Sequence, residues 1–142
     1  MPFGKDKQTA GSVTVLEPPS GAKRWPDMAH ILIVDAQTEL CHKLVRLLEQ
    51  AGHQATAVAT ISEAANLLNE RVPDLLATNV VLTDGSAINL AKQAEAAGTK
   101  VPMITGSPDR IMEFDGSGQP YLSKPFPPEG FLRRVHEILS PR

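Results

Sequence analysis

Short apolar runs alternate with amphipathic stretches from His30 onward, and this alternation limits the fold more than any other feature of the sequence. The first run, His30 to Val34, ends at Asp35 and is typical of a strand buried on both faces of a parallel sheet. Leucines then recur at helical spacing until Gly52, as in an amphipathic helix that is followed by a glycine. The pattern therefore predicts an α/β domain.

The remaining elements repeat this order. Strands are predicted over residues 30–34, 53–59, 75–82, 101–105 and 121–123. A capping box of Thr60 and Glu63 opens the second helix, and an alanine-rich helix runs from about Ser86 to Ala97. Such alternation predicts a doubly wound parallel sheet with helices on both faces, whose functional site lies off the carboxyl ends of the strands. The residues at those ends are Asp35, Ala36, Asn79, Ser107 and Lys124.

Residues 1–29 differ in composition from residues 30–142, and we interpret them as an N-terminal extension of one domain. Glycine and proline interrupt the extension every few residues, so no strand or helix longer than Ser12 to Leu16 is expected there. Trp25 is its one large apolar group, and we expect this side chain to pack on the domain. The extension could cover a helix face, complete the sheet beside an outer strand, or exchange with a neighbouring subunit.

Composition and charge exclude several classes of function. A net charge of −2 over 142 residues provides no basic field for nucleic acid or an anionic membrane. No apolar run approaches the roughly 20 residues that span a bilayer. Cys41 is the single cysteine, so no internal disulfide forms, and we expect a cytoplasmic protein. The four histidines lack the spacing of metal ligands, so no metal site is predicted.

Residues 30–140 resemble the receiver domain of response regulators. The strongest signal is the run Tyr121 to Phe126, of sequence YLSKPF, which is followed by a C-terminal amphipathic helix. Weaker signals are the segments 31–35, 73–75 and 101–104. The resemblance implies a flavodoxin-like fold of five parallel strands in the order 2-1-3-4-5. It also implies a role in bacterial two-component, or phosphorelay, signal transduction, and a cis peptide bond between Lys124 and Pro125.

The resemblance also implies a site. A working receiver accepts a phosphoryl group from a histidine kinase on an aspartate at the end of its third strand, with Mg²⁺ bound by that aspartate and two preceding acids. A hydroxyl after the fourth strand, a lysine after the fifth and an aromatic switch residue complete it. Carried over position by position, the resemblance puts the two acids at Asp35 and Ala36 and the phosphoacceptor at Asn79. It puts the hydroxyl at Ser107, the aromatic residue at Tyr121 and the lysine at Lys124.

Two of these positions depart from the family's chemistry. Asn79 carries a neutral carboxamide, which is a poor nucleophile and forms no acyl phosphate. With Ala36 also uncharged, Asp35 and Lys124 leave a formal pocket charge of zero, whereas Mg²⁺ prefers anionic oxygen ligands. We therefore expect magnesium binding to be lost or weak and no cofactor to be used. Lys124 is expected to pair with Asp35 or to donate to the Asn79 side-chain oxygen, which would hold the pocket closed.

The segment between Ser107 and Lys124 looks short for the family and contains several glycines and prolines. We expect the fourth helix to be reduced to about one turn around Asp109 to Phe114, or to be absent. Because that helix normally contributes to the signalling surface, the usual modes of output are not assumed.

The sequence thus favours a pseudo-receiver that is not an enzyme and acts as a phosphorylation-independent interaction or regulatory module. Its expected partner is a signalling protein such as a histidine kinase, a response regulator or an output protein, and a homodimer is left open. One alternative is a small-ligand or anion sensor using Asn79, Ser107 and Lys124. Another is a conventional phosphoacceptor with Asp84 or Asp109 as the substitute carboxylate. A flavodoxin-like enzyme is disfavoured because no phosphate-binding loop follows the first strand.

Overall fold

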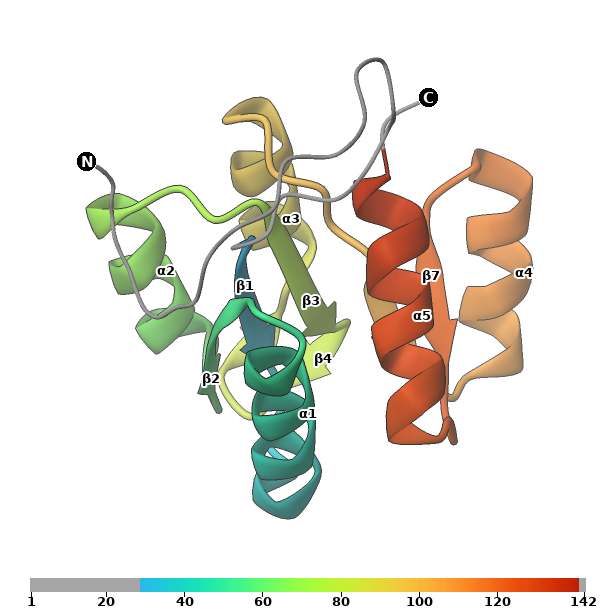
Figure 1. Cartoon of the computed structure of the whole chain (residues 1–142). Coiled ribbons are helices and arrows are strands. Elements are labelled where there is room, and N and C mark those ends of the chain that lie inside the picture. The colour runs from blue at the N-terminus through green and yellow to red at the C-terminus, as the bar shows by residue number, and fades with distance from the viewer. Residues whose placement is uncertain (1–28, 141–142) are drawn as a thin grey trace.

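A five-stranded parallel sheet forms the centre of the computed structural model, which describes residues 29–140 (Figure 1). Every neighbouring pair of strands in it is parallel. In spatial order the strands are β2 (Gln54–Val58), β1 (His30–Val34), β3 (Leu75–Asn79), β6 (Met103–Thr105) and β7 (Tyr121–Ser123). Since β6 and β7 are the fourth and fifth strands of this sheet along the chain, the predicted order 2-1-3-4-5 is confirmed.

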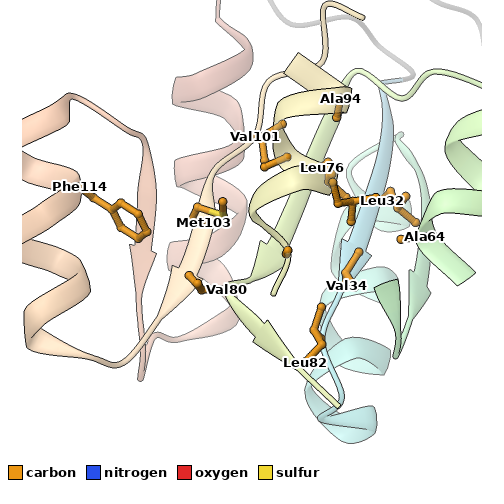
Figure 2. Packing of buried hydrophobic residues seen from close by; sticks show 13 residues of the cluster. Leu32, Val34, Ala64, Leu76, Val80, Leu82, Ala94, Val101, Met103 and Phe114 are labelled. Carbon is orange, nitrogen blue, oxygen red and sulfur yellow. The ribbon is translucent and has the colours of Figure 1, made fainter. Parts of the chain in front are cut away.

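Helices cover both faces of the sheet. Packing against one face are α1 (Thr38–Gln50) and α5 (Pro128–Leu139), whose buried residues form one cluster with Ile31, Ile33 and Leu75. The other face carries α2 (Ile61–Glu70), α3 (Ile88–Ala96) and α4 (Pro108–Ser117). Leu32, Val34 and Leu76 point to this second cluster, shown in Figure 2. The two-residue period of each strand therefore divides its side chains between two cores.

The central strands are the most buried part of the molecule. Residues 31–34 of β1 are all buried, as are residues 75–78 of β3. Each leucine, isoleucine or valine removed from water in this way stabilises the fold by about 1.5–3 kcal/mol. The sheet is consequently a rigid platform for the residues that follow its strands.

The prediction for the fourth helix is wrong. Helix α4 runs from Pro108 to Ser117 and is ten residues long. Pro108 opens the helix, where a missing N–H costs nothing, and the Ser107 side chain accepts from the Arg110 N–H as the N-cap. Gly118 ends it in the left-handed conformation with φ 78°. Proline and glycine therefore bound this helix instead of breaking it.

The third strand also ends earlier than predicted. It stops at Asn79, and the chain then forms a small hairpin of β4 (Val81–Leu82) and β5 (Gly85–Ser86). Gly85 has φ +133°, which side-chain-bearing residues rarely adopt. As a result α3 begins at Ile88, two residues later than expected.

The predicted extension, including Trp25, lies outside the described residues except for Ala29, which is buried beside β1. Within residues 29–140, no helix has the length and apolar character needed to cross a bilayer.

Candidate functional site

The residues predicted from the sequence lie at the carboxyl ends of β1, β3 and β7, at one end of the sheet. Asp35 comes directly after β1, Asn79 ends β3, and Lys124 comes directly after β7. Asn79 lies in register with Ile104 of β6, so the ends of β3 and β6 are level. By the two-residue period of their strands, all three side chains continue the row on the face covered by α1 and α5.

Asp35 and Lys124 form an ion pair. Lys124 Nζ lies 2.8 Å from Asp35 Oδ2, with side-chain exposures of 23% and 1%. This confirms the first of the two arrangements expected for the lysine. Because the carboxylate is buried, the pair is shielded from solvent on its acidic side and a lone Asp35 charge would be costly.

Gln37 bonds to both members of the pair and was not predicted from the sequence. Its side-chain Oε1 accepts from Lys124 Nζ at 2.9 Å, and its backbone N–H donates to Asp35 Oδ1 at 2.9 Å. The lysine is therefore directed to Asp35 and Gln37 and not to Asn79. Gln37 precedes the first residue of α1, where its position two residues after Asp35 was the only available signal.

A surface hollow of about 600 Å³ flanks this cluster. Its lining includes Gln37, Lys124 and Phe126, but neither Asn79 nor Ser107. The three residues suggested as an anion sensor therefore do not share this hollow.

Cys41 closes the inner side of the site. Its Sγ donates to the Asp35 carbonyl oxygen at 3.3 Å. Burial, followed by the neighbouring Asp35 charge, raises the pKa of the Cys41 thiol to about 11. The side chain is thus a buried thiol and not a reactive thiolate at neutral pH.

The hydroxyl at the end of β6 belongs to Thr105, which sequence reasoning did not select. Ser107 uses its own Oγ to accept from the Arg110 N–H at 3.4 Å and so caps α4. Thr105 is 8% exposed, and its Oγ1 accepts from the Ser107 N–H at 3.0 Å. The signal that could have identified Thr105 is its place at the end of the apolar run 101–105.

Tyr121 is bound to α4. Its hydroxyl donates to Asp115 Oδ1 at 2.8 Å, and its ring lies 6.0 Å from that of Phe114 between centroids. This hydrogen bond, with smaller effects of desolvation and the Asp115 charge, raises the pKa of the Tyr121 phenol. The contact fixes the ring against α4, and the predicted switch role stays a prediction.

Neither suggested substitute carboxylate is directed to the phosphoacceptor position by the contacts it makes. Asp84 Oδ1 accepts from the Ile61 N–H at 2.9 Å, and Oδ2 accepts from the Ser62 N–H at 3.0 Å. These two hydrogen bonds hold the pKa of Asp84 below its ordinary value. Asp84 therefore caps α2 from the hairpin, while Asp109 is exposed in the first turn of α4.

Two of the histidines meet although they are far apart in sequence. His53 Nε2 lies 2.9 Å from His136 Nε2, and His53 Nδ1 accepts from the Ala29 N–H at 3.3 Å. Burial lowers the pKa of His136. Among residues 29–140, no group of three or more metal-ligating side chains is assembled.

Comparisons with known proteins agree with this geometry. Residues 31–136 match the profile of the response regulator receiver domain. The virulence transcriptional regulatory protein PhoP of Salmonella typhimurium is 26% identical over 117 residues, covering 79% of this chain and 52% of that protein. The phosphate regulon transcriptional regulatory protein PhoB of Escherichia coli is 28% identical over 116 residues, covering 77% and 51%. The chain thus spans about half the length of the curated relatives it matches.

Solved structures show the same fold. The chemotaxis response regulator CheY4 of Vibrio cholerae superposes with a TM-score of 0.69 at 25% identity, covering 79% of this chain and 99% of that chain. A two-component response regulator from Clostridium difficile gives a TM-score of 0.68 at 27% identity, covering 78% and 95%.

Proposed function

This chain belongs to the response regulator receiver family of two-component signalling, and we propose that it works there without phosphorylation, as a protein-interaction and regulatory module. One observation carries the proposal. Lys124 Nζ is held 2.8 Å from Asp35 and 2.9 Å from Gln37 at the strand edge, where Ala36 and Asn79 supply no further charge.

The chemistry of the residues at the carboxyl ends of the strands supports this function. A carboxamide at Asn79 cannot form an acyl phosphate, because its nitrogen is a poor nucleophile and its oxygen carries no charge. Asp35 is the one carboxylate among the five predicted pocket residues, and its Oδ2 is engaged by Lys124. A hard divalent cation would have to displace that lysine to reach Asp35 and would gain no second carboxylate. The module therefore uses no cofactor and catalyses no phosphoryl transfer.

The ion pair supports a constitutive conformation. Separating Lys124 from the buried Asp35 carboxylate would leave an uncompensated charge, which costs several kcal/mol. Since no bound phosphoryl group competes for the lysine, the pocket holds one arrangement and recognition depends on the shape of the domain. The partner we propose is another signalling protein: a histidine kinase, a response regulator or an output protein.

The test is incubation of the full chain with acetyl phosphate and Mg²⁺, followed by intact mass measurement. The natural chain is compared with Asn79→Asp and with the double variant Ala36→Asp, Asn79→Asp. Asn89→Asp is a matched control, because it makes the same substitution at an exposed position on α3.

We expect no adduct on the natural chain or on the Asn89→Asp control. The double variant should gain about 80 Da, the mass of one phosphoryl group. An adduct on the natural chain would contradict the proposal and identify a carboxylate other than position 79 as the acceptor.

A further inference from the structure

The outer strand β2 presents an open edge. It is last in the strand order, and β1 is its one strand partner among residues 29–140. No residue of β2 is buried, whereas four of the five residues of β1 are. Edge strands usually carry a charge or a proline that blocks further pairing, but the sequence of β2, Gln-Ala-Thr-Ala-Val, has neither.

The backbone of β2 shows which groups face outward. The Gln54 N–H donates to the Ala29 carbonyl of the β1 side at 2.9 Å, and the Val58 carbonyl accepts from Asp35 N–H at 3.0 Å. Backbone groups alternate between the two sides of a strand, so Ala55 and Ala57 direct their N–H and C=O groups away from β1. Two adjacent donor and acceptor pairs are therefore available on the outer side.

Both ends of this edge are already closed by side chains. Arg71 Nη1 donates to Gln54 Oε1 at 3.0 Å, and the Ala59 N–H donates to Glu63 Oε1 at 3.3 Å. The open backbone groups therefore lie between these two contacts, on Ala55 and Ala57, and can pair with a short added strand.

The edge is hollowed on both faces of the sheet. On the α1 side a hollow of about 630 Å³ is lined by Val45 and Ala57 and by charged or polar residues of α1: Glu39, His42, Lys43, Arg46 and Glu49. On the α2 side a smaller hollow of about 130 Å³ is lined by Leu32 and Leu67 and by four polar or charged residues: His30, Thr56, Glu70 and Arg71. Figure 1 shows β2 at the margin of the sheet, between α1 and α2. An added strand would place alternate side chains in these two hollows.

We propose that the segment Ser12 to Leu16 of this same chain occupies the β2 edge as a sixth strand. Its sequence, Ser-Val-Thr-Val-Leu, is the longest stretch of the extension free of glycine, proline and charge. Its three central residues, Val13, Thr14 and Val15, are all β-branched and suit a strand, and the segment brings no charge to be buried in the hollows.

The chain between Leu16 and Ala29 is long enough for the segment to reach the β2 edge. Ala29, where the described chain begins, is hydrogen-bonded to Gln54 at the start of β2. Twelve residues join Leu16 to Ala29 and can span up to about 40 Å, against roughly 17 Å for the length of β2. A tether of this length keeps the segment at a high effective concentration beside the edge.

Amide hydrogen exchange measured by NMR on the full chain tests the proposal. The natural chain is compared with Val13→Pro, Val15→Pro, which removes two backbone donors from the segment. Gln8→Pro, Ser20→Pro is the matched control, because it places two prolines in the extension outside the segment. Light scattering at two protein concentrations gives the mass of each sample.

In the natural chain we expect at least one outward amide, Ala55 or Ala57, to exchange at least about tenfold more slowly than in the Val13→Pro, Val15→Pro variant. The control should match the natural chain, the Ile33 amide should not change, and all samples should have the mass of one chain. Equal exchange of Ala55 and Ala57 in all three proteins would overturn the proposal. Protection accompanied by the mass of two chains would also overturn it, and would assign the edge to a second copy.

Discussion

Two groups of residues border the pocket at the carboxyl ends of the strands, and different contacts hold each group in place. The charged wall, made of Asp35, Gln37 and Lys124, is held by an ion pair of 2.8 Å around a buried carboxylate. The hairpin wall, residues 79–86, has a neutral Asn79 at its start and is held to α2 by the exposed carboxylate of Asp84. One wall thus depends on a buried charge, and the other on the burial of Val80 and Leu82 together with the surface cap made by Asp84.

This difference indicates which wall sets the state of the pocket. A buried charge tolerates no loss of its partner, whereas an exposed carboxylate that leaves its partners is solvated by water. Loss of the ion pair should therefore cost more than loss of the Asp84 cap, which leaves Val80 and Leu82 buried in the core. Because Asn79 carries no charge, it does not compete with Asp35 for Lys124.

Lys124→Met is the change with the largest expected effect. It leaves the Asp35 carboxylate buried without a cation, and we expect the free energy of unfolding to fall by roughly 3 kcal/mol in urea titrations. Lys43→Met is the matched control, since Lys43 is exposed on α1 and lines the hollow of about 600 Å³ that Lys124 also lines. Equal losses in the two variants would show that the ion pair does not hold the charged wall.

The double variant Asp35→Asn, Lys124→Met sharpens this test. Replacing both charges removes the unpaired carboxylate, so most of the loss in Lys124→Met should be recovered. A double variant less stable than Lys124→Met would indicate that Asp35 stabilises the domain through contacts other than the pair.

Asp84→Ala should have the next largest effect, confined to the hairpin wall. The N–H groups of Ile61 and Ser62 lose their acceptors, so their exchange should accelerate, while Asp109→Ala serves as the exposed acidic control. The two hydrogen bonds hold the folded pKa of Asp84 below its ordinary value of 3.8. The cap's contribution is therefore complete above that pH and is lost as pH falls through the folded pKa. Unchanged exchange of both amides would contradict the cap.

Ser107→Ala should have a smaller effect, because it removes the acceptor of one α4 amide. We expect a loss of about 1 kcal/mol in unfolding free energy, typical of an N-cap serine. Ser123→Ala is the control at an exposed strand position. A loss no greater than in the control would leave the Ser107 hydroxyl free for another role, including the place in the pocket that the resemblance implies.

Asp115→Asn should have the smallest effect, on the titration of one side chain. Tyr121 is the single tyrosine, so its phenol can be followed by ultraviolet absorbance. Its hydrogen bond to Asp115 raises the pKa of the phenol, and the substitution should return that pKa toward the ordinary 10.0. An unchanged titration curve would mean that the ring is not bound to α4 in solution.

Much of the fold follows from local patterns, but several contacts do not. Hydrophobic period and the placement of glycines predicted the alternation of strands and helices, whereas the strand order was implied by the resemblance to receiver domains. The fourth helix was predicted to be too short or absent because Pro108 and Gly118 were interpreted as interruptions, whereas they occupy its first turn and its C-cap. The bonds of Asp84 to α2 and of His53 to His136 join residues 22 to 83 positions apart, and no local pattern encodes them.

The candidate site, too, was predicted only in part. Asp35 and Lys124 were predicted because each follows a strand, and Asn79 because the resemblance places the phosphoacceptor there. The sheet brings the carboxyl ends of these strands to one end of the domain. Gln37 was not predicted, because a glutamine before a helix carries no chemical signal until the lysine from β7 reaches it. Thr105 was passed over because the resemblance was carried over to Ser107, although the predicted strand 101–105 ends at Thr105 as β6 does.

Calorimetric titration with Mg²⁺ is the most direct test of the proposal that Lys124 takes the place of the cation in the pocket. The natural chain, the Asn89→Asp control and the Ala36→Asp, Asn79→Asp variant are titrated under the same conditions. We predict saturable binding to the double variant and none to the other two at concentrations that saturate it. Saturable binding to the natural chain at those concentrations would contradict a pocket closed by the Lys124–Asp35 pair.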